Sequence, residues 1–327
     1  MANMKYRTLG RTGFEVSEVG FGCGRTGGIL LNATLDERRS AMRKALDGGI
    51  NWFDTAEAYG SEPALGELLG ELDETPYVST KVTLDPGAGD LAGQVARHLD
   101  GCLERLQKDF VDLAQLHNRI DPTIGGDSRA MSVEQVLGPG GIAEGLEKAR
   151  DDGRCRAIGF TSLGDVPSIL KVIESGRFDS TQIFYNMINP SAARPMPPAW
   201  TGQNLFGLID ACKAQDMGII AIRVLVGGII AADMRERRVS MMTKETDKET
   251  EIAKGNAILD ELGDGYGSGA QLGLRFALSC ADISLALVGI GEPGHVDAAL
   301  AASDMGALPA DALEALEALC DSDFAQA

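Results

Sequence analysis

Clusters of histidine and cysteine are missing from this sequence. Its 327 residues contain only three histidines, His98, His117 and His295, and six scattered cysteines, none of them in a C-x-x-C pair. Zinc sites need several such ligands at short spacing, and redox-active dithiols need paired cysteines. We therefore expect no metal site, and we expect the cysteines to be reduced and mostly buried.

Positive charge is also scarce. The chain has 30 Lys and Arg residues against 48 Asp and Glu residues, which gives a formal net charge of −18 and an isoelectric point of about 4.6. A surface of this kind repels the phosphate backbone of nucleic acids. We therefore expect no nucleic-acid partner.

Long hydrophobic runs are absent as well. No stretch of the sequence approaches the roughly 20 apolar residues that cross a bilayer as a helix. Residues 1–16 lack the apolar segment of a secretory signal peptide. We expect no membrane association and a cytoplasmic location.

Short apolar runs that alternate with amphipathic stretches dominate the rest of the chain. The apolar runs cover residues 17–22, 50–56, 77–82, 110–118, 156–162, 181–186, 218–225 and 284–290. Strands that alternate with helices of this size indicate parallel, right-handed βαβ crossovers. Eight such units fit one (β/α)8 TIM barrel, and we assign residues 1–327 to a single domain of this kind.

Two further elements are expected outside the eight units. Residues 5–17 predict an N-terminal β-hairpin, and residues 308–323 predict an amphipathic helix that closes the fold at its C-terminal end. The alternative architecture is a doubly wound sheet, which usually has G-x-G-x-x-G after its first strand. Residues 20–28, GFGCGRTGG, come close to this motif without keeping its spacing.

Smaller features of the chain carry expectations of their own. Asp36 is expected to cap the first long helix, which should end at Gly48. The long connections at residues 119–140 and 226–255 are expected to lie at one rim of the barrel, where specificity loops usually lie.

Polar side chains fall where the second, third and fourth predicted strands end. Because side chains of a strand alternate faces, Asp54, Lys81 and His117 would all point into the barrel from neighbouring strands. Buried charges are costly unless they are paired, so Asp54 and Lys81 are expected to pair. Tyr59 follows in the next loop and can fold back over the mouth. Each residue alone has an ordinary structural explanation, and their convergence on one rim predicts a functional site.

At this point the sequence resembles the aldo-keto reductase superfamily. The matching segments are YRTLGRTGFEVSEVGFGCG (6–24), GINWFDTAEAYGSEPALGELLG (49–70), VSTKV (78–82), DLAQLHN (112–118), AIGFTS (157–162) and TQIFYN (181–186). The resemblance runs in the expected order from the hairpin to about residue 300. It implies a (β/α)8 barrel that binds NAD(P)H and reduces aldehydes or ketones, or that oxidises an alcohol or sugar in reverse.

The resemblance also implies roles for individual residues. Asp54, Tyr59, Lys81 and His117 match the catalytic tetrad of the family. Tyr59 would be the general acid, Lys81 would stabilise the phenolate, and Asp54 would hold Lys81. Neutral His117 would hydrogen-bond the substrate oxygen.

The implied cofactor site is larger. Its positions are Gly22, Asp54, Thr161, Ser162, Gln182, Arg223, Val224, Leu225, Gly227, Gly289, Gly291, Glu292 and His295. Thr161 and Ser162 replace the usual Ser-Asn pair at the nicotinamide carboxamide, and the seventh strand has no aromatic residue to stack on the ring. After the eighth strand, Glu292 would repel a 2′-phosphate and suit a free ribose. NAD is therefore favoured slightly over NADP, although Arg223 or the loop after the seventh strand could reverse this preference.

Two other functions stay open. The chain could be a catalytically silent cofactor-binding redox sensor or subunit of the same fold, although a pure binder need not keep Tyr59 and Lys81. It could also be another barrel enzyme such as a metal-dependent hydrolase or isomerase, which the shortage of histidine ligands argues against. The sequence does not identify the substrate beyond a small carbonyl compound or sugar, and it does not predict an oligomeric state.

Overall fold

Eight parallel strands close into a barrel that helices surround. The structure is a computed structural model that describes residues 4–122, 129–231 and 247–324. The strands neighbour one another in the order β10-β3-β4-β5-β6-β7-β8-β9. Their bounds are β3 Val19–Gly22, β4 Trp52–Asp54, β5 Tyr77–Val82, β6 Val111–Leu116, β7 Cys155–Thr161, β8 Ser180–Phe184, β9 Gly218–Ile222 and β10 Leu285–Gly289. The prediction of a (β/α)8 barrel is confirmed.

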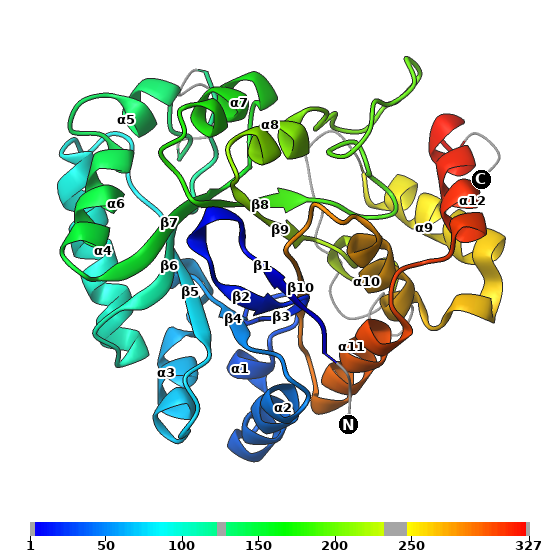
Figure 1. Cartoon of the computed structure of the whole chain (residues 1–327), viewed down its shortest axis with the longest axis horizontal. Helices are drawn as coiled ribbons and strands as arrows, with labels where there is room; N and C mark the ends of the chain where they lie inside the picture. Colours follow the sequence, from blue (N-terminus) through cyan, green and yellow to red (C-terminus); the bar gives the residue numbers. More distant parts are fainter. Residues whose placement is uncertain (1–3, 123–128, 232–246, 325–327) are drawn as a thin grey trace.

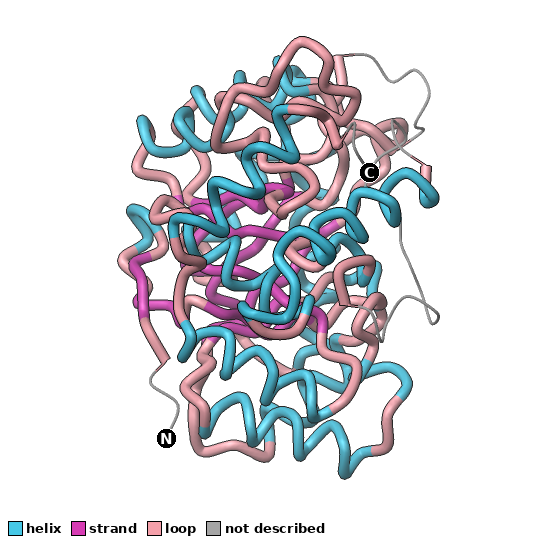
Figure 2. The backbone as a smooth tube through the Cα atoms, turned by 90° about the vertical axis from the view of Figure 1, so that its right-hand side faces the viewer, coloured by secondary structure: helices cyan, strands magenta, loops and turns pink. Residues whose placement is uncertain are grey.

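The helices form the outer layer, and Figure 2 shows them enclosing the strands. They are α1 Ile29–Asn32, α2 Leu35–Asp47, α3 Glu62–Gly70, α4 Leu91–Leu106, α5 Val133–Leu137, α6 Ile142–Asp151, α7 Val166–Glu174, α8 Leu208–Ala214, α9 Lys248–Leu262, α10 Gly269–Ser279, α11 Pro293–Met305 and α12 Ala310–Asp321. The final helix, α12, matches the predicted closing helix and lies beside α9 (Figure 1).

The cap of α2 differs from the prediction. Thr34, and not Asp36, is the N-cap, because Thr34 and Glu37 bond each other reciprocally in a capping box. Asp36 instead lies in the first turn, where its charge favours the helix dipole. The helix ends at Gly48 as expected.

The predicted hairpin covers one end of the barrel. Its strands, β1 Tyr6–Thr8 and β2 Glu15–Ser17, pair antiparallel, and Figure 1 shows them across the barrel opening. Leu9, Phe14 and Val16 pack on inward side chains of the barrel strands, including Trp52 and Leu113. This apolar cluster seals the N-terminal ends of the strands.

Gly10 lets the hairpin approach the barrel closely. It has φ +47°, and a Cβ there would lie 2.3 Å from the backbone nitrogen of Gly218 on β9. Next to it, the backbone N–H of Arg11 donates to the Asp216 carbonyl at 2.7 Å. A side chain at Gly10 would therefore force the hairpin away from the barrel.

The carboxyl ends of the strands lie at the opposite end from the hairpin. Parts of the two long connections, residues 123–128 and 232–246, lie outside the described residues. Within the described ranges, no helix is long and apolar enough to cross a membrane.

Candidate active site

A short turn positions Tyr59 directly after strand β4. The strand ends at Asp54, and a single 3₁₀ turn, η2 Glu57–Tyr59, follows before α3 begins. The Thr55 N–H donates to the Ser79 carbonyl at 2.9 Å, so the chain leaves the barrel along β5. Gly60, at φ +78°, then turns the chain sharply into α3. This turn brings the Tyr59 side chain close to Lys81 on β5.

Lys81 is the centre of the site. Its ammonium lies 2.5 Å from Asp54 Oδ2, 2.9 Å from the Thr55 carbonyl and 3.5 Å from the Tyr59 hydroxyl. The side chain of Lys81 is 0% exposed and that of Asp54 is 5% exposed. Because an ammonium has three N–H donors, these contacts leave it fully paired inside the barrel.

The Asp54 carboxylate gathers donors from several strands. Besides Lys81, it accepts from Ser79 Oγ at 2.6 Å, Gln182 Nε2 at 2.8 Å and Gln115 Nε2 at 3.5 Å. Burial alone lowers the pKa of Lys81, but the Asp54 carboxylate and the Tyr59 phenol outweigh it and raise that pKa above its usual value. Lys81 is therefore a cation throughout the physiological pH range.

His117 packs beside Tyr59. The two rings pack edge to face with their centroids 5.5 Å apart. Burial, assisted by the Lys81 ammonium, lowers the pKa of His117 from 6.5 to about 3. The imidazole is therefore neutral at neutral pH, and it can donate or accept one hydrogen bond at the mouth of the barrel.

A second acidic residue fastens the Tyr59 turn. Glu57 accepts a hydrogen bond from the Thr83 N–H at the end of β5, and its other oxygen lies 2.9 Å from His98 Nδ1 on α4. Glu57 stands in the same 3₁₀ turn as Tyr59. These contacts couple the position of Tyr59 to β5 and α4.

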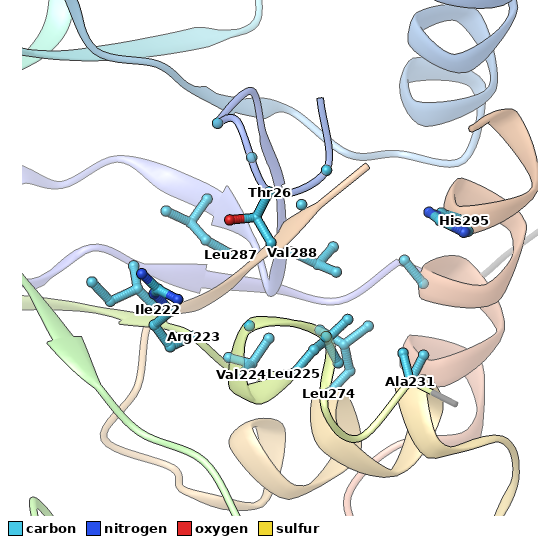
Figure 3. A pocket seen from close by; sticks show the side chains of 18 of the residues that line it. Thr26, Ile222, Arg223, Val224, Leu225, Ala231, Leu274, Leu287, Val288 and His295 are labelled. Atoms are coloured by element: carbon cyan, nitrogen blue, oxygen red, sulfur yellow. The ribbon is translucent and has the colours of Figure 1, made fainter. Parts of the chain in front are cut away.

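Two cavities meet at Tyr59. The first has a volume of about 350 Å³ and extends from Asp54 and Tyr59 to His295 on α11. We call it the α11 cavity, and Figure 3 shows Ile222 and Arg223 at one end of it and His295 at the other. The second, the His117 cavity, has a volume of about 400 Å³ and is lined by Tyr59, His117 and Thr161, among others. Both cavities are lined by Tyr59, Gln182 and Arg223, so molecules bound in the two would be neighbours near Tyr59.

Most of the predicted cofactor positions line these cavities. Those in the α11 cavity are Gly22, Asp54, Gln182, Arg223, Val224, Leu225, Gly227, Gly289 and His295. Gln182 and Arg223 line the His117 cavity too, together with Thr161.

Three predicted cofactor positions lie outside both linings. Ser162 turns its hydroxyl to Thr181 Oγ1 at 2.8 Å, on the helix-facing side of the sheet. Gly291 donates its N–H to His295 Nδ1 at 3.1 Å. Glu292 is the N-cap of α11, and its side chain is 58% exposed. The first is directed away from the barrel interior, and the other two stand at the start of α11.

Several lining residues were not expected from the sequence. They are Gly24, Thr26, Gly27, Gly228, Ala231, Ser268, Ala270, Leu274, Leu287, Val288, Ala298 and Ala299 in the α11 cavity, and Ala58, Leu163 and Phe184 in the His117 cavity. Gly27 has a visible signal, because the Gly-rich stretch 20–28 predicts close backbone approach. A Cβ at Gly27 would lie 2.4 Å from the Ile290 nitrogen. The residues of α10 and α11 give no such signal.

The backbone after β9 is strained where both cavities touch it. Arg223 has φ +59° and Val226 has φ +52°, a left-handed conformation that is rare for residues with a side chain and rarer still for a β-branched one. Asn186 Nδ2 donates to the Arg223 carbonyl at 3.2 Å and helps to hold this turn. Such a strained backbone is retained only where the surrounding structure imposes it, and it is found most often at functional sites.

A metal centre finds no support among the described residues. Within them, no group of three or more His, Cys, Asp or Glu side chains could hold a metal ion. The Asp54 carboxylate is already occupied by hydrogen bonds from Lys81, Ser79 and Gln182.

The sequence matches one known protein family over most of its length. The model of the Aldo/keto reductase family matches residues 18–321. The chain belongs to this family of NAD(P)-dependent oxidoreductases. The family assignment from the sequence is therefore confirmed.

Two curated relatives illustrate the range of the family. The chain is 27% identical to L-galactose dehydrogenase of Arabidopsis thaliana over 92% of its own length and 89% of that protein. It is also 30% identical to a probable voltage-gated potassium channel subunit beta of Oryza sativa subsp. japonica, over 42% of this chain and 44% of that one.

Solved structures share the fold. The aldo-keto reductase AKR11C1 from Bacillus halodurans, in its holo form, matches with a TM-score of 0.70 and 20% identity over 97% of both chains. An aldo-keto reductase from Klebsiella pneumoniae in complex with NADPH matches with a TM-score of 0.69 and 20% identity, over 97% of this chain and 95% of that one. At this identity the likeness establishes the fold alone.

Proposed function

We propose that this chain interconverts a small aldehyde or ketone and its alcohol, sugars included, with a nicotinamide dinucleotide as hydride carrier. The observation that carries the proposal is the contact of Lys81 with both Asp54 and the Tyr59 hydroxyl at the junction of the two cavities. The full-length similarity to L-galactose dehydrogenase supports it.

Proton transfer is the chain's own part of this chemistry. Reduction of a carbonyl builds an alkoxide, which needs a proton and donors around it. In our proposal Tyr59 gives that proton and recovers it in the oxidation direction. Lys81 stabilises the phenolate, and Asp54 keeps Lys81 in place. Neutral His117 orients the substrate oxygen by a hydrogen bond.

The α11 cavity suits a dinucleotide. It is elongated, and much of its wall consists of glycine and alanine, which allow close approach of a diphosphate. At its far end it reaches His295 in the first turn of α11, where backbone N–H groups favour an anion. When bound there, the cofactor supplies the hydride. Gln182 and Thr161, near Tyr59, are the proposed contacts of the nicotinamide end.

The nucleotide preference is proposed from charge. Among the described residues, the α11 cavity is lined by no lysine and by no arginine except Arg223, which lies at the end opposite His295. The N-cap Glu292 would repel a 2′-phosphate, so we propose a modest preference for NAD. The Klebsiella neighbour carries NADPH, which points towards NADP. The loop that could supply a cation, residues 232–246, lies outside the described residues.

Titration with NADH and NADPH, followed by fluorescence, measures this preference. We expect NADH to bind more tightly, and we expect Glu292→Gln to shift the ratio towards NADPH. Tighter binding of NADPH by the unmodified chain would show that the charge argument is wrong.

The catalytic proposal is tested by Tyr59→Phe, which removes only the hydroxyl. We expect turnover of aldehydes to fall by roughly 10³-fold, the middle of the range for general acid catalysis, while NADH binding stays intact. The matched control is Tyr6→Phe, because the Tyr6 hydroxyl bonds Gly49 beside the hairpin, far from the site. Comparable rates in Tyr59→Phe and the unmodified chain would remove Tyr59 from the acid role.

A second candidate is a cofactor-binding subunit without turnover. The similarity to a potassium channel subunit beta favours it. It predicts nucleotide binding with no oxidation of NADH by any aldehyde, and equal behaviour of Tyr59→Phe and the unmodified chain. Turnover that depends on Tyr59 would contradict it.

A further inference from the structure

The His117 cavity carries charge of one sign. Its described lining contains two arginines, Arg25 and Arg223, and no aspartate or glutamate. Apart from Tyr59, His117 and a few other polar groups, the wall is apolar or small, with residues such as Leu163 and Phe184. This is opposite to the whole chain, whose formal net charge is −18. Outside this lining, the buried carboxylate of Glu251 on α9 also acts electrostatically on Arg223.

Arg223 is the more deeply placed of the two arginines. It lines both cavities, and its left-handed backbone (φ +59°) is held through its carbonyl by Asn186. Figure 3 shows its side chain next to Ile222 at the end of the α11 cavity, where the two cavities join. Backbone strain of this kind is frequent at functional sites, and Arg223 lines both cavities of this one.

Arg25 stands at the rim. It donates from Nη2 to the Ala58 carbonyl at 2.6 Å and from Nε to the Tyr59 carbonyl at 3.4 Å. These contacts tie the loop after β3 to the turn that carries Tyr59. The positive charge of Arg25 therefore faces the cavity entrance from a fixed position next to the proposed acid.

From this arrangement we propose that the His117 cavity selects carbonyl compounds that carry a carboxylate. Arg223 binds the carboxylate, and Arg25 adds positive charge at the entrance. A guanidinium matches a carboxylate with two parallel N–H donors, and such charge-assisted bonds are about twice as strong as neutral ones. The inference rests on the proposed function and specifies its substrate class.

The reaction itself is unchanged by the carboxylate. The carbonyl carbon accepts the hydride that the reduced nicotinamide supplies and forms a new C–H bond. The π bond of C=O breaks, its electron pair moves to the oxygen, and the oxygen takes the Tyr59 proton, which leaves a C–O single bond and a Tyr59 phenolate. The carboxylate keeps its charge and serves only to bind and orient the molecule.

A matched pair of substrates tests this selectivity. We would compare kcat/KM for 4-carboxybenzaldehyde and for its neutral methyl ester, with NADH and with NADPH. The unmodified chain is expected to prefer the carboxylate by at least about 10-fold, the size of one charged hydrogen bond. Arg223→Met is expected to reduce that ratio by about 10-fold or more, and Arg223→Lys by less. Arg43→Met, which removes an exposed arginine on α2, should leave the ratio unchanged.

The outcomes separate this inference from the proposed function. A ratio of about one or below in the unmodified chain overturns the inference, as does an equal fall for both aldehydes in Arg223→Met. If neither aldehyde turns over, calorimetry with benzoate and benzamide on the NADH-loaded chain decides. Tighter binding of benzoate that Arg223→Met abolishes supports the anion site even though the proposed function fails. Equal affinities overturn the site.

Discussion

The two ends of the barrel are built by the same strands and are chemically opposite. At the end under the hairpin, inward side chains such as Trp52 and Leu113 are apolar and pack on Phe14. Two positions further along the same strands, the inward side chains are Asp54 and Gln115, and both are buried and hydrogen-bonded. Only two residues along the same strand therefore separate the sealed end from the proposed reactive end.

The two ends differ in what they contribute: the sealed end contributes mainly to stability, and the open end carries the groups proposed for the reaction. Burial of aromatic and aliphatic surface stabilises the sealed end. A buried ion pair gains little over an apolar packing of the same volume, so the Asp54–Lys81 pair at the open end is explained better by chemistry than by stability. The strained backbone at Arg223 and Val226 lies at the same open end. Substitutions at the two ends should therefore have separable effects.

The largest effect is expected from Lys81→Met at the open end. We expect kcat/KM to fall by about 10³-fold or more, because Tyr59 loses its charged partner. The free energy of unfolding should also fall by about 3–5 kcal/mol, because Asp54 is left buried without a cation. Lys44→Met, which removes an exposed partner of Asp297 on the surface, is the control. Steady-state kinetics and urea denaturation measure both quantities, and near-normal activity in Lys81→Met would contradict the account.

Trp52→Ala tests the sealed end. Removal of a fully buried indole is expected to lower the free energy of unfolding by about 3–5 kcal/mol. The value of kcat measured at a temperature where the variant is folded should stay close to that of the unmodified chain. A fall in kcat with little loss of stability would mean that the two ends are not separable.

Glu57→Gln sharpens the comparison within the open end. Glu57 is not expected to touch the substrate, but it ties the Tyr59 turn to Thr83 and His98. We expect kcat to fall by roughly 10-fold while KM changes little, since a displaced acid slows the chemical step more than binding. Glu74→Gln, at a surface partner of Arg43, is the control. If KM alone rose, Glu57 would have a different role.

At mildly acidic pH, just below 6.5, the smallest effect is the pH dependence of stability at His117. Its pKa is about 3 in the folded chain and 6.5 ordinarily. The unfolded chain therefore binds more protons between these values, so the stability contributed by neutral His117 is complete above pH 6.5 and declines as the pH falls towards 3. We expect His117→Gln to be less sensitive to acid than the unmodified chain in this window. Parallel pH dependences in urea denaturation would contradict the depressed pKa.

Most of the fold could be predicted from the sequence, because short apolar runs alternate visibly with amphipathic stretches along the chain. The hairpin at residues 5–17 was predicted from the turn glycines Gly10 and Gly13, and the last helix at residues 308–323 from its amphipathic pattern; the structure contains both. The cap of α2 was misassigned because Asp36 and Thr34 are both good caps by type. The reciprocal bond between Thr34 and Glu37 decides between them.

The candidate site was predictable where it lies on strands. The spacing of Asp54 and Lys81 and the alternation of strand faces predict their pairing, which the structure contains. The walls from α10 and α11, such as Leu274 and Ala298, were missed because their orientation depends on how distant helices pack. The hydroxyl of Ser162 is directed to Thr181, and the backbone turn at Arg223 also depends on tertiary contacts.

A crystal structure of the chain with NADH and an unreactive carboxylate-bearing carbonyl analogue would test the central claim most directly. The account predicts the carbonyl oxygen within hydrogen-bonding distance of the Tyr59 hydroxyl and His117, in the cavity that both line, with Lys81 still in contact with Asp54. An analogue oxygen bound away from Tyr59, or a Tyr59 hydroxyl separated from Lys81 in that complex, would contradict it.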